Sequence, residues 1–419
     1  MSSKLEECKT TRVILVRHGQ STYNSLGLYQ GCSDESVLTE LGYSDARKTG
    51  DFLKGVKFDV MYTSSLKRAQ QTAREILGVV APQVSPEIIF VSDLLKETNL
   101  PAWQGLAFQY VKQNFPQEYS NWKQRPHEFC MNPPPPSLQG KGEQNSLPEI
   151  DKHSSPLLLG EGLGERFYPA IDLYNRINKF WQQVLPHYIG KTLLLVVHGG
   201  TNRALISTAL GINPDRYHCI QQSNCGISVL AFPDGTLKSG RLETMNLTSH
   251  VGENLPKLQE GGKGLRLLLV PSGASSEQVN NLVEQLKEVN ILLCLSDTLN
   301  DSYTLAQELI KHHPETADLR VVQDLLEWQR MIVNKPIISN NLVTALVIAK
   351  EEIIQTLISK VIGINLDNKN RLQVKQRTIS IIQYPDSLHP PILQGMNISI
   401  GQKHLVIGDL YPSFCCSYE

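Results

Sequence analysis

The sequence predicts an α/β fold in which helices cover both faces of a sheet, followed by a second, altered copy of the same fold. Two observations lead to this prediction. Short apolar runs alternate with segments of helical periodicity up to about residue 250, and several sequence blocks recur in the same order after residue 264. An alternation of strands and helices is typical of a sheet that is covered on both faces.

The elements of the first half are predicted in order from their apolar spacing. Strands are short apolar runs that end at polar residues or glycine, and helices carry apolar residues at helical spacing. The predicted strands are 13–16, 59–62, 88–91, 192–197, 227–232 and a stretch around 244–247. The predicted helices are 41–53, 66–77, 173–185 and 202–210.

Two stretches interrupt this rhythm. Residues 133–165 contain PPPP and several glycines, and we expect a mobile inserted loop there, with an ordered lid as the alternative. Residues 248–264 are polar and contain glycine and proline, which is typical of a linker. We therefore expect a first domain at 8–250, a linker at 251–263 and a second domain at 264–410.

The second half repeats blocks of the first. The matched blocks include TRVILVRHGQST with LRLLLVPSGASS, LISTALGI with LISKVIGI, ISVLAFPD with ISIIQYPD, and MNLT with MNIS. The alternative is that two α/β domains share only a generic strand and helix composition. Because six blocks match in the same order, we predict a true repeat and two similar domains in tandem.

The overall composition limits the classes of function. The 419 residues are 41% hydrophobic and carry a net charge of −1, so neither nucleic acid nor a membrane is expected as a partner. Eight cysteines without a CxxC pair favour a reducing compartment. The chain start lacks a leader-like apolar region, and no apolar run approaches the length of a membrane span. We therefore expect a cytoplasmic protein.

Two histidines follow predicted strands in the same way. Arg17 and His18 come directly after the first strand, and His198 comes directly after the strand at 192–197. Each histidine is followed by a glycine, which permits close approach of the backbone to a ligand. Because ligands bind outside the carboxyl ends of the strands in such sheets, we expect both histidines in one pocket.

Two further residues complete a candidate for phosphoryl transfer. Arg68 opens a helix in SSLKRAQQTA, where its guanidinium and the helix dipole both suit phosphate, and Glu97 follows the third strand. A neutral histidine would attack phosphorus, and the positive groups would stabilise the charge on its oxygens. A carboxylic acid would protonate the leaving oxygen. No metal and no cofactor is expected.

The segments LVRHGQSTYN, SSLKRAQQTA and VVHGG together resemble the signatures of the histidine phosphatase superfamily, the phosphoglycerate mutase-like group. The resemblance covers about residues 11–247 and implies a three-layer α/β/α domain. It implies that His18 is the phosphorylated nucleophile and that Glu97 is the proton donor. The phosphate-binding residues that it implies are Arg17, Arg68 and His198, with Asn24, Gln30, Gly31 and Gly199 as further substrate-binding positions.

The sequence departs from the family pattern in two places. The usual Trp-Glu-Gly after the acid reads Trp103-Gln104-Gly105, which removes a secondary carboxyl contact. The Gly-Glu-Ser segment expected before the helix at 173–185 is displaced by the insertion, and Gly164-Glu165 is only a partial match. The substrate-specific wall of the pocket is therefore expected to differ.

The second copy lacks the reactive residues. Pro271 and Ser272 align with Arg17 and His18, Asp301 aligns with Arg68, and Lys350 aligns with His198, although Glu327 and Trp328 lie near the equivalent of Glu97. A pocket of this composition has neither a nucleophile nor a cationic clamp. We predict that 264–410 is a silent, degenerate copy that serves dimerisation, lid support or effector binding.

These observations predict that the protein is a phosphomonoesterase that acts on a small phosphorylated metabolite. The tandem arrangement resembles two-domain phosphatases of 2-carboxy-D-arabinitol 1-phosphate. Another sugar phosphate, phosphoserine and a nucleotide-loop intermediate such as alpha-ribazole phosphate remain alternative substrates. A phosphoglycerate mutase is a rival, because the same phosphohistidine can return its phosphate to the substrate. A regulatory protein that binds phosphorylated ligands is a second rival. A homodimer remains an open alternative for the assembly.

Overall fold

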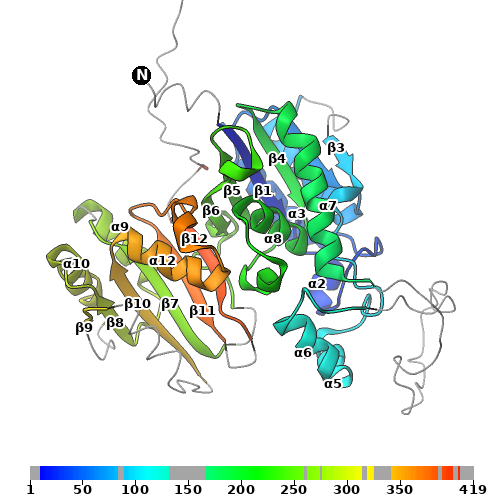
Figure 1. Ribbon diagram of the computed structural model, residues 1–419. Helices are drawn as coiled ribbons and strands as arrows, with labels where there is room; N and C mark the ends of the chain where they lie inside the picture. The colour runs from blue at the N-terminus through cyan, green and yellow to red at the C-terminus, as the bar shows by residue number, and fades with distance from the viewer. Residues whose placement is uncertain are drawn as a thin grey trace, which may run out of the picture.

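The computed structural model describes residues 10–83, 89–131, 167–258, 262–273, 276–313, 319–324, 341–385, 389–399 and 404–405. The predicted insertion at 133–165, which includes Gly164 and Glu165, lies outside these residues, and so do Glu327 and Trp328. The strands form a 12-stranded sheet in the order β3-β2-β4-β1-β5-β6-β12-β11-β7-β10-β8-β9 (Figure 1).

The first half of the sheet contains six strands. Strands β1, β4, β2 and β3 are parallel to one another. On the other side of β1, strand β5 pairs antiparallel with β1, and β6 pairs antiparallel with β5. The strands are β1 (Thr11–Arg17), β2 (Val60–Ser64), β3 (Ile89–Ser92), β4 (Thr192–Val197), β5 (Ile227–Phe232) and β6 (Arg241–Leu247). The α-helices are α2 (Thr22–Leu26), α3 (Glu40–Phe52), α4 (Lys67–Val80), α5 (Phe108–Asn114), α6 (Pro116–Gln124), α7 (Pro169–Val184) and α8 (Gly199–Leu210).

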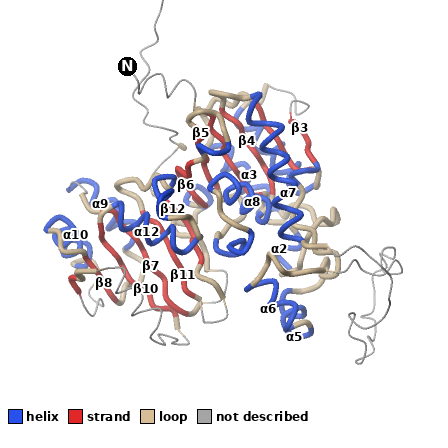
Figure 2. The backbone as a smooth tube through the Cα atoms, viewed as in Figure 1, coloured by secondary structure: helices blue, strands red, loops and turns tan. Residues whose placement is uncertain are grey.

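The core lies in two layers, one on each face of the sheet. Figure 2 shows the helices that pack against the strands. Val13 and Leu15 of β1 face α7 and α8, whereas Ile14 and Val16 face α3 and α4. This alternation follows from the strand period of two, and all four side chains are fully buried. The predicted three-layer α/β/α architecture is therefore confirmed.

The second half repeats the strand order of the first. Strands β9-β8-β10-β7-β11-β12 correspond one by one to β3-β2-β4-β1-β5-β6, and β6 pairs antiparallel with β12 in the middle of the sheet. The strands are β7 (Gly264–Pro271), β8 (Leu293–Ser296), β9 (Leu319–Val321), β10 (Leu342–Ala349), β11 (Ile379–Tyr384) and β12 (Ile392–Ile398). The helices are α9 (Ser276–Leu286), α10 (Asn300–Ile310) and α12 (Glu351–Ile362). The predicted second copy of the fold is confirmed.

The observed elements differ from the predicted ones mainly at their ends. Helix α8 begins at Gly199 rather than at residue 202, because Gly199 and Gly200 form its first turn despite the low helix propensity of glycine. Helices α2, α5 and α6 were not predicted, and the last two are short and weakly amphipathic. No helix among the described residues is long and apolar enough to cross a membrane.

Candidate active site

His18 and His198 meet at the carboxyl ends of two neighbouring parallel strands. Strand β1 pairs with β4 so that Arg17 lies opposite Val197, and each histidine follows directly. Their ring centroids are 5.2 Å apart, at an interplanar angle of 62°. Both side chains are almost completely buried. The pairing of the two strands therefore places the two rings in contact.

The hydrogen bond of His18 sets the position of its proton. Nδ1 lies 2.7 Å from the carbonyl oxygen of Gly19, which can only accept, so Nδ1 carries the hydrogen. In the neutral ring, the lone pair is then on Nε2. Burial, followed by the positive charges of Arg68 and Arg17, holds the pKa of His18 well below its ordinary value of 6.5. The ring is therefore neutral and nucleophilic at neutral pH.

His198 caps the N-terminus of α8. Burial lowers its pKa well below 6.5, and the positive charge of Arg68 lowers it further. Neither of its ring nitrogens has a hydrogen-bond partner among the described residues. A buried polar group without a partner is costly, so both nitrogens are suited to a ligand in the pocket.

Two arginines approach the same site from different elements. Arg17 ends β1, and its Nη1 donates to the carbonyl of Gln222 over 2.7 Å. Arg68 lies in the first turn of α4, fully buried, and donates to the carbonyls of Ser33 at 2.8 Å and Gly31 at 2.9 Å. Burial lowers the pKa of Arg17 to about 10, which still leaves it charged at neutral pH. The buried Nε atoms of both arginines have no partner among the described residues.

Glu97 reaches the first turn of α8 because residue 200 is glycine. Its Oε2 accepts from the Gly200 backbone N–H at 3.1 Å, and its Oε1 accepts from the Thr98 backbone N–H at 2.7 Å. A Cβ on Gly200 would lie 2.3 Å from Glu97 Oε1, Thr98 Oγ1 and Tyr217 Oη. Gly200 was not predicted as a site residue, although it directly follows the predicted Gly199 in the His-Gly-Gly motif.

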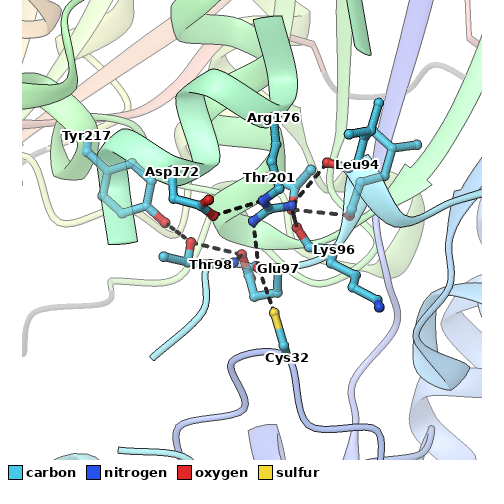
Figure 3. A network of polar contacts seen from close by, with 10 residues as sticks. Cys32, Leu94, Lys96, Glu97, Thr98, Asp172, Arg176, Thr201 and Tyr217 are labelled. Atoms are coloured by element: carbon cyan, nitrogen blue, oxygen red, sulfur yellow. Dashed lines mark hydrogen bonds and ion pairs between the residues drawn. The ribbon is translucent and has the colours of Figure 1, made fainter. Parts of the chain in front are cut away.

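Arg176 of α7 holds the backbone around Glu97 (Figure 3). It donates to the carbonyls of Leu94 and Lys96, each at 3.1 Å, and to the carbonyl of Glu97 at 3.2 Å. Its Nε also forms an ion pair with Asp172 at 3.0 Å, four residues earlier on the same helix. Arg176 was not predicted as a site residue, because its spacing from Asp172 indicates only an ion pair within one helix and not its bonds to the segment before Glu97.

The remaining predicted binding residues support the loops around the site. Asn24 caps α2 with Ser21, and its Oδ1 accepts from Asn224 Nδ2 at 3.1 Å. Gln30 accepts from the Ser21 hydroxyl at 2.9 Å.

The two predicted binding glycines lie against arginines. Gly31 adopts a φ of 50° and accepts from Arg68, so its backbone is part of the clamp that holds Arg68. A Cβ on Gly199 would lie only 3.3 Å from Arg17 Nε. Both glycines therefore belong to the packing of the two arginines.

A model of the histidine phosphatase superfamily, branch 1, matches residues 13–144 and 144–247, which together are more than half of the chain. The chain belongs to the histidine phosphatase superfamily. Both matched segments lie in the first half and meet at residue 144, within the predicted insertion. The superfamily assignment therefore applies to the half that contains His18 and His198.

Curated proteins that are named for three different activities are similar to this chain. A 2-carboxy-D-arabinitol-1-phosphatase of Triticum aestivum is 32% identical over 267 residues, which are 63% of this chain and 46% of that protein. A phosphoserine phosphatase 1 of Hydrogenobacter thermophilus is 26% identical and covers 58% of this chain and 95% of its own length. A 2,3-bisphosphoglycerate-dependent phosphoglycerate mutase of Bartonella tribocorum is 32% identical, over 55% of this chain and 98% of its own. The chain spans about half the length of the plant relatives that it matches.

Proposed function

We propose that this protein is a phosphomonoesterase that hydrolyses a small phosphorylated metabolite through a phosphohistidine on His18. The observation that carries the proposal is the neutral His18 ring, whose Nδ1 hydrogen bond leaves the lone pair on Nε2, beside His198, the buried Arg68 and the half-buried Arg17. A nucleophile must be unprotonated, and its neighbours must stabilise negative charge on phosphate oxygens. The site combines both requirements.

The first step of the proposed mechanism transfers the phosphoryl group to the enzyme. His18 Nε2 forms a bond to phosphorus while the bond between phosphorus and the leaving oxygen breaks, and its electron pair stays on that oxygen. The acid form of Glu97 gives a proton to the leaving oxygen. Arg17, Arg68 and His198 bind the equatorial oxygens.

The second step regenerates the enzyme. Water attacks the phosphorus of the phosphohistidine, the bond between phosphorus and Nε2 breaks, and Glu97 takes the proton that water loses. Phosphate then leaves. The proton donated in the first step is thus returned, and the two steps balance as the hydrolysis of a phosphomonoester.

For the substrate we propose a phosphorylated sugar acid, 2-carboxy-D-arabinitol 1-phosphate, with another sugar phosphate or phosphoserine as alternatives. The similarity to relatives named for the first and last of these substrates supports this class. The chain is also similar to phosphoglycerate mutases, so a mutase activity is the rival for the same phosphohistidine.

A screen of phosphorylated metabolites tests the proposed function. The wild-type protein is expected to release phosphate from at least one of them and to carry an acid-labile phosphoryl group on His18. His18→Ala is expected to lower the rate at least about 10³-fold, because the covalent route is lost. A coupled assay for interconversion of 2- and 3-phosphoglycerate identifies a mutase. Interconversion without phosphate release would overturn the phosphatase proposal, and phosphate release unchanged in His18→Ala would overturn the nucleophile.

We further propose that the second half, at 264–410, is catalytically silent. Pro271 ends β7 where Arg17 ends β1, Asp301 takes the place of Arg68 in the first turn of α10, and Lys350 caps α12 where His198 caps α8. The Asp297 carboxylate is buried and accepts from the backbone N–H groups of Lys350 at 3.0 Å and Leu299 at 3.1 Å.

The helix ends that would hold phosphate therefore already hold a carboxylate. If the second half were active, the His18→Ala protein would keep measurable phosphatase activity, so the same variant tests both proposals.

A further inference from the structure

The two halves contact each other through pairs of equivalent bonds, as the two subunits of a symmetric dimer do. Met245 of β6 pairs with Met396 of β12, its own equivalent in the repeat. The amide of Asn246 donates to the carbonyl of Gln394 at 2.7 Å, and the amide of Asn397 donates to the carbonyl of Glu243 at 2.7 Å. These two amide bonds are therefore equivalent across the junction.

The two sides of this junction have different neighbours. On the first side, the junction contacts the segment 220–226, which we call the bridging segment. Arg17 Nη1 donates to the Gln222 carbonyl at 2.7 Å, and Asn224 Nδ2 donates to the His18 carbonyl at 2.9 Å. The Cys225 N–H donates to the Arg17 carbonyl at 3.0 Å. The bridging segment thus holds both the nucleophile and its neighbouring arginine.

The second half holds the bridging segment through Gln394. The Gln394 Nε2 donates to Gln221 Oε1 at 3.0 Å and to Gln383 Oε1 at 2.9 Å, so both of its hydrogens are used. The Gln221 N–H in turn donates to the carbonyl of Leu393 at 2.9 Å. The side chains of Gln221, Gln383 and Gln394 are almost completely buried. Water cannot replace these bonds without opening the junction.

Asn246 forms a second connection between Gln394 and the bridging segment. While its Nδ2 donates to the Gln394 carbonyl, its Oδ1 accepts from the Ser223 N–H at 2.7 Å. A Cβ on Gly226 would lie 2.5 Å from that same Oδ1, so the glycine leaves room for the contact. The bridging segment is therefore fixed at residues 221 and 223, on both sides of the carbonyl that binds Arg17.

We propose that Gln394, in the silent half, is a positioning residue for the active site, acting on Arg17 and His18 through Gln221, Asn246 and the bridging segment. This inference rests on the proposed phosphatase function. It gives the second half a specific task, because the first half alone would leave these buried donors and acceptors without partners. Displacement of a phosphate-binding group by even about 1 Å is enough to lower a rate about 10²-fold.

The repeat supplies a matched control. Asn397 is the equivalent of Asn246, with a φ of 56° against 57°, and both make one bond of 2.7 Å across the junction. The Asn397 Oδ1, however, accepts from the Lys375 N–H at 3.0 Å, in the half without a nucleophile. Glycine tolerates the left-handed backbone at both sites, so Asn246→Gly and Asn397→Gly remove equivalent amides without new strain.

The test compares Gln394→Met, Asn246→Gly and Asn397→Gly in the full chain. The first two variants are expected to lower kcat about tenfold at saturating substrate, while Asn397→Gly stays within about twofold of wild type. The two glycine variants are expected to shift the urea midpoint equally, which separates positioning from general stability. Equal kcat values for Asn246→Gly and Asn397→Gly, or an unchanged kcat for Gln394→Met, would overturn the proposal.

Hydrogen exchange distinguishes failure of this inference from failure of the proposed function. The bridging segment is expected to exchange faster in Gln394→Met and Asn246→Gly than in Asn397→Gly. If the wild type releases no phosphate from any compound, the phosphatase function fails, and the exchange rates still decide whether Gln394 holds the segment. Wild-type exchange in all three variants would refute the inference independently of activity. If Gln394→Met does not fold, the two glycine variants decide.

Discussion

Gly200 shows how a single missing methyl group shapes the site. A Cβ there would lie 2.3 Å from Glu97 Oε1, Thr98 Oγ1 and Tyr217 Oη. Gly200→Ala is therefore expected to displace Glu97 and to lower kcat about 10²-fold in a phosphate-release assay. Gly78→Ala in α4 is the control, because a Cβ there meets nothing within 4 Å. It should keep full activity and raise the free energy of unfolding by about 0.5–1 kcal/mol. An active Gly200→Ala enzyme would show that Glu97 does not require this approach.

The site residues that the sequence predicts lie at strand ends, whereas the residues that it does not predict have partners far away in the sequence. Arg17, His18 and His198 were found because each follows a strand, and strand ends collect at one edge of a parallel sheet. Arg176 and Asn224 instead donate to backbone carbonyls of distant segments. Arg176 lies 82 residues from Leu94 and 79 residues from Glu97 in the sequence, and Asn224 lies 206 residues from His18. Such partners leave no local pattern, so only the folded structure identifies them.

A half-buried histidine next to the site makes stability depend on pH. His250 stacks on Phe52, and its Nε2 lies 3.1 Å from the Cys225 carbonyl. Burial lowers its pKa to about 4, whereas the unfolded chain protonates near the ordinary value of 6.5. Between these values the unfolded state binds more protons, so stability is complete above about pH 6.5 and is lost as pH falls toward 4.

The His250 contribution is measured by urea unfolding at several pH values. Each such histidine lowers the free energy of unfolding by about 1.4 kcal/mol per pH unit within this window. The His250→Gln variant has no titrating ring at this position. Its free energy of unfolding should therefore change less steeply with pH, by that amount per pH unit. An identical slope in the variant would mean that His250 titrates normally in the folded state.

At the scale of elements, helix α7 fixes the position of Glu97. Arg176 donates to three carbonyls at and before Glu97, which lie at the end of the short helix Asp93–Leu95. Arg176→Lys keeps the charge but lacks the planar fork that reaches several acceptors. We expect kcat to fall about tenfold, with a small change in KM for the phosphorylated substrate, because the role proposed for Glu97 is in bond cleavage. Arg47→Lys is the control, since its ion pair with Glu75 is exposed on the surface. Equal activities of the two lysine variants would contradict this role.

Helix prediction from apolar spacing located α7 but not its function. Its inner face carries Leu173, Ile177 and Trp181, which are buried and follow the helical period. The same pattern treats Arg176 as a solvated charge on the outer face. The polar side of α7 contacts the loop after β3, a tertiary contact between segments that are far apart in the sequence. Apolar spacing therefore predicts a helix whose position is set by core packing. It does not predict the role of a polar side chain whose partners lie in a distant loop.

At the scale of the whole molecule, the repeated sequence blocks predicted two similar folds but not their junction. The blocks preserve strand positions, such as Met245 and Met396, because both copies need the same buried sheet. They contain no signal that these two residues face each other across one continuous sheet. The reciprocal bonds of Asn246 and Asn397 depend on the relative orientation of the copies, which only the folded chain defines.

The shared sheet leads to a prediction about cooperativity. Each of the two core layers contains residues of both halves, for example Leu205 with Leu357 in one and Val16 with Leu268 in the other. Neither half can therefore lose its structure without exposing apolar surface of the other. We expect a single urea transition in which labelling of the buried Cys225 thiol of the first half and of the buried Cys294 thiol of the second half, each resolved by peptide mass, has the same midpoint. Labelling of Cys294 at a urea concentration where phosphatase activity persists would contradict this expectation. It would also mean that the second half is dispensable for holding the bridging segment.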